Sequence, residues 1–322
     1  MGFVYDTPGG LVGKVLTEIN RCRAVLPLIR AVQDFAPDLI YLRWGMYVFP
    51  SQRIFKIAPV VVEINTNDVS QHEMLGAVLS FYNRLTRGIF LSRAAGLVYT
   101  SSELEKCESF AAYHRPGIVI ANGIDMTRNT SVPAPHNIRP RIGFIGTPDL
   151  PWQGVDKLIR LAMLCPDLDI DVIGFDSFND GQLQPSNLYF HGYLDQEKSR
   201  EILSGVDIGL GTIALHRKAM NEASPLKTRE YLAYGIPVIV PYQDTDLDDL
   251  NIDTILRLQN TEDNMEQNWK RIRDFAIKMQ GQRVDRAKIS HRIDSEIKEQ
   301  TRLKFFTECS IRNRTVNEFK SN

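Results

Sequence analysis

The segment that decides the fold reads Glu-Ala-Ser-Pro-Leu-Lys-Thr-Arg-Glu at residues 222–230. Ser224 is a favourable N-cap, and Pro225 suits the first helical position, where a missing N–H costs nothing. We therefore predict a helix that runs to Tyr234 and is ended by the glycine after it. The apolar run Val238–Val240 then predicts a buried strand. Together they form one helix–strand unit of the kind that builds parallel sheets.

The start of this predicted helix has the features of an anion site. The amides of Leu226 and Lys227 have no acceptor inside a helix that begins here, and the helix dipole adds positive potential at the same point. The Lys227 ammonium lies nearby, so the three groups match a diphosphate. Glu230 lies one turn further along, where it can accept hydrogen bonds from a ribose diol. Glu222 precedes the helix and would face sugar hydroxyls at the other end of the ligand.

These residues resemble the Glu-x7-Glu motif of retaining GT-B glycosyltransferases, especially family 4, in the form Ser-Pro-Leu-Lys followed by Glu-Tyr-Leu-Ala-x-Gly-x-Pro-Val-Ile. The resemblance implies that Glu222 contacts the donor sugar and Glu230 the nucleotide ribose. It implies that the diphosphate is held by the helix start, namely Ser224, Pro225, Leu226 and Lys227. An ordinary crossover helix is the alternative, but it does not account for the cap, proline, lysine and strand together.

Composition limits the classes of function. The chain has 322 residues, enough for two domains, and its net charge of −1 gives no general attraction for nucleic acid. The four cysteines are far apart, so neither a zinc site nor a disulfide framework is indicated. No apolar stretch approaches the ~20 residues that span a bilayer. We expect a cytoplasmic protein with no metal, no tightly bound cofactor and no nucleic-acid partner.

Apolar runs alternate with helical patterns along the chain, which is typical of parallel sheets covered by helices. Strands are predicted at Leu39–Leu42, Val60–Ile64, Gly96–Thr100, Ile118–Ala121, Arg141–Ile145, Ile170–Ile173, Leu188–His191, Ile208–Leu210 and Pro237–Val240. A proline-rich stretch at 131–140 reads as a linker. We predict an α/β protein of the GT-B class, with two doubly wound, Rossmann-like lobes facing a crevice. Residues 1–135 would form the acceptor-side lobe and 136–299 the donor lobe, with a helix at about 300–322 returning to the first lobe.

The first lobe looks short beside the family pattern. Relatives place several βα units before the strand that here begins near Asp38. Only Phe3–Tyr5 and a Pro-Gly-Gly turn precede the first predicted helix. We expect the first units to be missing, which would remove part of the acceptor site and leave an exposed sheet edge.

Further site residues lie in loops after other predicted strands. Gly146, Thr147 and Gln153 belong to the loop after the first strand of the second lobe. Many relatives carry an arginine and a lysine there, so in this chain phosphate binding would depend more on Lys227. A rigid surface loop without ligand contact is equally consistent with this stretch. Gly192 and Tyr193 would border the nucleobase, where glycine permits close approach of the backbone.

Two features of the first lobe remain open. Asn65 ends a strand and could hydrogen-bond the transferred sugar, although capping of the next helix by Asn65 or Asp68 is an alternative. His72 is expected on that helix. Arg84, Arg87 and Arg93 accompany apolar residues at helical spacing, which suggests either a membrane-facing helix or a solvated crossover helix.

The resemblance implies a retaining glycosyltransferase that moves a sugar from a nucleotide-diphosphate sugar to a saccharide or lipid-linked acceptor, in glycan or envelope polysaccharide synthesis. Its catalytic residues would be Glu222 and Asn65, and it would contact the inner membrane surface peripherally. The alternative is a non-catalytic nucleotide-sugar-binding or scaffold protein derived from a truncated GT-B enzyme. The shortened lobe and the missing basic pair favour that alternative.

Overall fold

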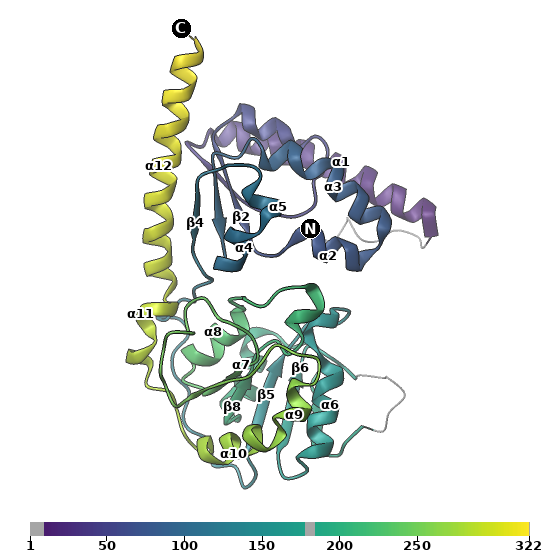
Figure 1. The fold of residues 1–322 in the computed structure, drawn as a ribbon, viewed down its shortest axis with the longest axis vertical. Helices are drawn as coiled ribbons and strands as arrows, with labels where there is room; N and C mark the ends of the chain where they lie inside the picture. Colours follow the sequence, from purple (N-terminus) through teal and green to yellow (C-terminus); the bar gives the residue numbers. More distant parts are fainter. Residues whose placement is uncertain (1–9, 178–183, 322) are drawn as a thin grey trace. The chain divides into compact units, whose positions relative to one another are not determined.

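The computed structural model describes residues 10–177 and 184–321 (Figure 1). The chain divides into two compact units. The first comprises Met1–Ile120 with Thr301–Asn322, and the second comprises Ala121–Gln300. The short predicted strand Phe3–Tyr5 lies outside the described residues.

The first unit contains a parallel sheet of four strands in the order β1-β2-β3-β4. Its strands are β1 Ile40–Arg43, β2 Val60–Ile64, β3 Gly96–Tyr99 and β4 Gly117–Val119. Its helical elements are α1 Gly10–Phe35, η2 Ser51–Lys56, α2 Asp68–Leu75, α3 Ala77–Leu91, α4 Ser102–Lys106 and α5 Glu108–Ala111. Helix α12, Ser295–Ser321, begins in the second unit and continues into the first.

Helix α12 contributes to the core of the first unit. Phe305 and Cys309 are buried against Val61 and Val98 of the sheet. A Cβ on Gly96 would lie 2.6 Å from the Cys309 sulfur, so the absence of a side chain there lets the helix approach β3 closely. The order of the described strands puts β1 at an edge of this sheet.

The second unit contains a parallel sheet of six strands in the order β10-β9-β8-β5-β6-β7. Its strands are β5 Arg141–Ile145, β6 Asp169–Ile173, β7 Leu188–Phe190, β8 Ile208–Leu210, β9 Val238–Val240 and β10 Ile255–Arg257. The helical elements are η3 Pro151–Gln153, α6 Val155–Leu164, α7 Gln196–Ser204, η4 Leu215–Lys218, α8 Leu226–Ala233, α9 Asn264–Gln267, α10 Trp269–Met279, η5 Arg286–Lys288 and α11 Ser290–Ile293.

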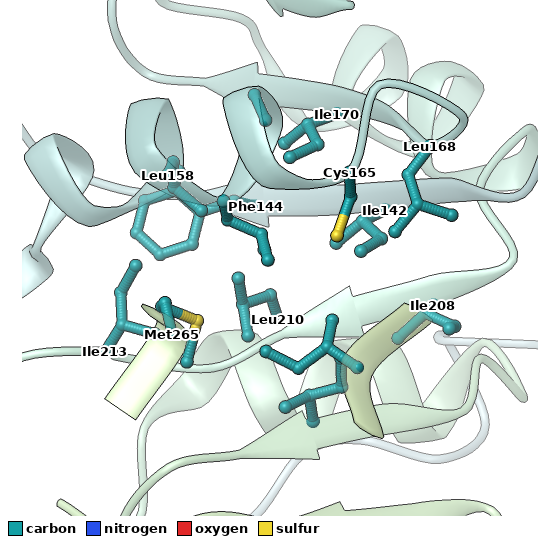
Figure 2. Packing of buried hydrophobic residues seen from close by; sticks show 14 of the residues in the cluster. Ile142, Phe144, Leu158, Cys165, Leu168, Ile170, Ile208, Leu210, Ile213 and Met265 are labelled. Atoms are coloured by element: carbon teal, nitrogen blue, oxygen red, sulfur yellow. The ribbon is translucent and has the colours of Figure 1, made fainter. Parts of the chain in front are cut away.

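Helices cover both faces of this sheet. Ile142 and Phe144 of β5 pack with residues of α6, α9 and α10 in one apolar cluster (Figure 2). On the other face, a Cβ on Gly143 would meet Leu203 of α7, and one on Gly209 would meet Tyr231 of α8. The unit is therefore doubly wound. Strand order reverses between β5 and β8, and ligands of open α/β sheets bind at the carboxyl ends of the strands beside such a switch point.

Candidate functional site

Helix α8 begins beside this switch point, and its first residues differ slightly from the prediction. The N-cap is Pro225, with ψ of 138° and no side-chain cap. The predicted cap at Ser224 is therefore wrong by one residue. The Ser224 hydroxyl accepts a hydrogen bond from the Asn122 amide at 3.1 Å, and its carbonyl accepts one from the Asn122 side chain at 2.7 Å. Ser224 is buried because it holds this distant turn.

The first two backbone amides of α8 make no hydrogen bond within the helix. The first amides bonded within the helix are those of Thr228 and Arg229, which both donate to the Pro225 carbonyl. Those of Leu226 and Lys227 precede the pattern, as predicted, and are available to an anion. The helix ends in a Schellman motif at Gly235, which has φ of +79°. The Tyr231 hydroxyl accepts a hydrogen bond from the Ile145 amide at 2.8 Å, which fixes α8 against the end of β5.

Lys227 reaches from α8 to the loop after β5. Its Nζ donates to the Gln153 side-chain oxygen at 2.8 Å and lies 4.0 Å from the centre of the Phe144 ring. Desolvation lowers the pKa of Lys227 to about 7. No carboxylate of the described residues forms an ion pair with the Lys227 ammonium. The lysine is therefore held by a neutral amide and an aromatic face.

The two glutamates of the motif have separate environments. Glu230 is half-buried, and burial raises its pKa, although a hydrogen bond with the Tyr234 hydroxyl opposes this shift. Glu222 is also half-buried and accepts a hydrogen bond from the Thr245 hydroxyl at 2.7 Å. A backbone bridge pairs Glu222 with Gln243. Thr245 and Gln243 follow β9 and were not singled out by the sequence.

Three glycines form the tight turns at the carboxyl ends of β5, β6 and β7. A Cβ on Gly174, which has φ of +98°, would lie 2.0 Å from the Gly146 carbonyl oxygen. Gly192 has φ of +67°, and its own Cβ would lie 2.5 Å from Asp176. The sequence had indicated Gly146 and Gly192 but missed Gly174. Its position directly after a predicted strand, like theirs, was the available signal.

The polar side chains around these turns differ in role. Tyr193 is 90% exposed and Thr147 is exposed, so both are accessible to a ligand. His191 is only partly exposed, and its Nε2 lies 2.7 Å from the carboxylate of buried Asp171. This hydrogen bond to Asp171 gives His191 a structural role.

Arg217 of η4 was missed by the sequence analysis. It lines a cavity of about 630 Å³ together with residues of the loop after β5 and with Phe175. Its guanidinium donates to Asp156 at 2.6 Å and also to Glu262. Two carboxylates therefore neutralise this guanidinium. An isolated arginine between loops gives no periodic signal, which explains the omission.

In the first unit, the predicted site residue Asn65 follows β2. When its side-chain amide is oriented with the oxygen toward Arg43, Asn65 accepts a hydrogen bond from the Arg43 Nε at 2.9 Å. Arg43 also lies 3.8 Å from Glu63, whose carboxylate accepts a hydrogen bond from Tyr41 at 2.5 Å. The cap of α2 is Asn67, between the two residues that had been considered.

The prediction that Arg84, Arg87 and Arg93 lie on one exposed basic helix face is wrong at Arg87. This arginine is buried, and its guanidinium pairs with Asp68 at 2.8 Å and bonds the Ser109 carbonyl at 2.7 Å. Helical spacing alone does not reveal that a buried carboxylate lies opposite. His72 lies on α2 as predicted, with Nδ1 2.6 Å from the Asp68 carbonyl oxygen. This hydrogen bond requires the proton on Nδ1.

Neither family models nor curated proteins match this sequence. Solved structures do match. Sucrose-phosphate synthase from Thermosynechococcus elongatus aligns with a TM-score of 0.65 at 13% identity, over 92% of this chain and 80% of that one. HepE from Anabaena in complex with UDP-glucose aligns with a TM-score of 0.59 at 13% identity, over 88% and 82%. An alpha-glucosyltransferase in complex with UDP-glucose and DNA aligns with a TM-score of 0.61 at 14% identity, over 89% and 84%.

The chain has the GT-B fold. The α/β class and the two parallel sheets expected from the sequence are thereby confirmed. Within this GT-B chain, the residues predicted for donor binding come from α8 and the loops after β5 and β7. Membership of family 4 and the role of the Glu-x7-Glu pair remain predictions. No helix of the described residues is long and apolar enough to cross a membrane. Over the same residues, no cluster of His, Cys, Asp and Glu side chains is placed to hold a metal.

Proposed function

We propose that this protein is a retaining glycosyltransferase of the family 4 type that uses a nucleotide-diphosphate sugar. One observation carries the proposal. Lys227 and two amides outside the helical pattern meet at the start of α8, beside the switch point of a parallel sheet. Structures with the same fold, including HepE, have been solved with UDP-glucose bound. Here the neighbours of the Lys227 ammonium are neutral, so binding of an anion would stabilise its charged form.

In the proposed complex each residue has a distinct task. Lys227 and the amides of Leu226 and Lys227 bind the diphosphate, with Ser224 and Pro225 fixing the turn that presents them. Glu230 accepts hydrogen bonds from the ribose, and Glu222 accepts them from the donor sugar. Gly146 and Gly192 let the ligand approach the backbone, while Thr147, Gln153 and Tyr193 border it. A base such as uracil would lie near Gly192, as in the resemblance.

The chemistry follows from the position of this positive field. As the glycosidic bond to phosphate breaks, negative charge grows on the departing nucleotide, and groups fixed in advance around the diphosphate stabilise that charge. Retention of configuration would come from return of the acceptor on the same face, with the leaving phosphate taking the acceptor proton. Asn65 would hydrogen-bond a hydroxyl group and would not act as a base.

The acceptor is a saccharide or a lipid-linked saccharide in our proposal, and the product belongs to glycan or envelope polysaccharide synthesis. We place the enzyme in the cytoplasm, in peripheral contact with the inner membrane surface. Exposed Phe81 and Leu85 of α3 favour such contact. No metal or tightly bound cofactor is needed for the proposed steps.

A thermal-shift panel of uridine, guanosine and adenosine diphosphate sugars tests the donor site. A donor at ~100 times its dissociation constant should stabilise the protein by about 2.7 kcal/mol. Lys227→Ala should abolish that stabilisation, and Glu230→Ala should reduce it. Lys278→Ala is the matched control, because Lys278 is an exposed lysine on α10. An unchanged response in Lys227→Ala would show that the phosphates bind elsewhere.

Donor hydrolysis separates an enzyme from a scaffold. An enzyme should release free sugar slowly without acceptor, and Glu222→Ala should lose that release. NMR spectroscopy of the first product should show the anomeric configuration of the donor retained. Tight donor binding without any turnover would favour the binding or scaffold protein instead.

A further inference from the structure

An open groove of the first unit lies outside every residue assigned so far. Its volume is about 1060 Å³, at the upper end of the range for small-molecule sites. Three segments line it: one face of α1, the turn at Phe49–Arg53, and the junction of α2 with α3 at Leu75–Leu79. Gly76 occupies this junction with φ of +117°, a conformation that side chains rarely adopt.

Apolar side chains dominate the groove although it is open. Ile19 and Leu26 contribute from α1, and Val78 contributes from α3. Ile19 is 41% exposed, Leu26 38% and Val78 82%. Exposed apolar surface of this extent costs free energy in water, because each hydrocarbon group loses the benefit of burial. A ligand with a hydrocarbon chain would recover that benefit.

Positive charge is placed along the same groove. Glu18 is the lining carboxylate, and it is already paired with Arg21 at 2.7 Å. Arg23 and Arg53 also line the groove and are exposed. Neither Arg23 nor Arg53 forms an ion pair with a carboxylate of residues 10–177 and 184–321. The unbalanced charge of the lining is therefore positive, and a guanidinium pair is well suited to a phosphate.

The apolar surface continues from the groove along α3. Val78 lines the groove, and Phe81 and Leu85 follow it at helical spacing, 70% and 69% exposed. Arg84, on the same helix, pairs with Glu73 of α2. An amphiphile that leaves a membrane could thus pass from an apolar helix face into an apolar groove with cationic residues along it.

We infer that this groove binds the hydrocarbon chain of a single anionic amphiphile, a lipid phosphate, whose phosphate is held by Arg23 and Arg53. The inference rests on the proposed function for one point only, namely that this molecule is the lipid part of the acceptor. Of the two acceptors proposed above, the inference favours the lipid-linked saccharide over the free saccharide. The groove binds a single lipid molecule, and this binding differs from adsorption of the protein on a bilayer.

Calorimetric titration of the full chain with farnesyl phosphate, below its aggregation concentration, tests the inference. Farnesol, which lacks the phosphate, is the matched ligand control. We expect farnesyl phosphate to bind at least tenfold more tightly than farnesol. In the double variant Arg23→Gln/Arg53→Gln this preference should fall to about onefold, with the farnesol affinity unchanged. Equal affinity of the two ligands for the unmodified protein would overturn the assignment of the arginines.

A second pair of variants tests the chain-binding part. Ala77 lines the groove, whereas Ala24 is exposed on α1 outside its lining. Ala77→Trp should lose both ligands, and Ala24→Trp should keep both. Full binding by a folded Ala77→Trp protein would overturn the inference. So would binding to anionic phospholipid vesicles without binding to dispersed farnesyl phosphate, since the surface would then be a bilayer contact.

The donor response distinguishes failure here from failure of the proposed function. The double arginine variant and the two tryptophan variants should all retain the thermal shift with the nucleotide sugar. If the unmodified protein binds farnesyl phosphate but no nucleotide sugar, the groove stands as a lipid-phosphate site and its acceptor role falls. If it binds the nucleotide sugar but no farnesyl phosphate, the donor site stands and the groove inference falls.

Discussion

Lys227 is the residue whose protonation should control the donor site. Its pKa of about 7 lies far below the usual value for lysine because Phe144 and the surrounding protein desolvate it. Above pH 7 the free protein therefore holds this amine largely neutral. A diphosphate favours the charged form, so binding above pH 7 must take up a proton.

Donor affinity should consequently fall as the pH rises above 7, by at most about tenfold per unit for one proton. Below pH 7 the amine is already charged and this contribution should be flat. Calorimetry between pH 6 and 9, in buffers of different ionisation enthalpy, measures both the affinity and the proton uptake. Lys227→Arg keeps its charge throughout and should lose the slope, whatever its absolute affinity. A wild-type slope in that variant would show that another group titrates.

The same lysine has a consequence for stability without ligand. Between its folded pKa near 7 and its unfolded value near 10.4, the unfolded chain binds one more proton than the folded one. The free energy of unfolding should therefore rise with pH across this window. Glu230 acts at lower pH: burial raises its pKa, which favours its protonated form in the folded protein.

Residue-level features were the hardest to predict from sequence. Ser224 looked like a cap but serves the Asn122 backbone, which lies 102 positions away. Arg87 had the spacing of a surface residue but faces buried Asp68. In both cases a local pattern was overruled by a partner distant in sequence, and one sequence carries no record of such pairings.

At the scale of elements, α8 is held by charges on its buried side. Arg229, which is fully buried, pairs with both oxygens of Asp244 at 2.8 Å and donates to the Asn122 carbonyl at 3.0 Å. Asp246 joins the group at 3.1 Å and also pairs with Lys298. Arg229 directly precedes Glu230, so this cluster fixes the turn of helix that carries the proposed ribose ligand.

Replacing Arg229 should therefore be costly. Arg229→Met leaves Asp244 buried without its partner, and we expect a loss of about 3–5 kcal/mol in the free energy of unfolding. The double variant Arg229→Met/Asp244→Leu removes both charges and should recover much of that loss. Urea denaturation of the four proteins of this cycle measures the coupling. Additive losses in the double variant would mean that the pair contributes little beyond packing.

Elements themselves were largely predictable, because their signals are local. The strand at Arg141–Ile145 was predicted with its observed bounds, and α8 was recovered to within one residue at each end. Gly235 supplied the stop through its positive φ. Strand β10, Ile255–Arg257, was missed because only two apolar residues precede its arginine, so it lacks the apolar run that marks β9. The groove was missed as well, since it arises from three segments that no single pattern connects.

At the scale of the whole molecule, each of the two units has its own hydrophobic core. The second unit buries its apolar residues around β5, β6 and β8 (Figure 2), while the first has a separate cluster around Val61, Val98 and Phe305. Units with separate cores can unfold separately, in which case one melting temperature does not describe the chain. The proposed donor ligands on α8 and the loops after β5 and β7 all belong to the second unit.

A nucleotide sugar should therefore protect the two units unequally. Hydrogen exchange followed by mass spectrometry should show slower exchange in peptides covering 141–154 and 224–240 when the donor is present. Peptides covering β2 and β3 should change little, because a ligand stabilises only the unfolding equilibrium in which its own site is lost. Lys227→Ala should remove the protection in the second unit. Equal slowing over both sheets would mean that they unfold as one cooperative body, so that donor binding would stabilise the sheet of the first unit too.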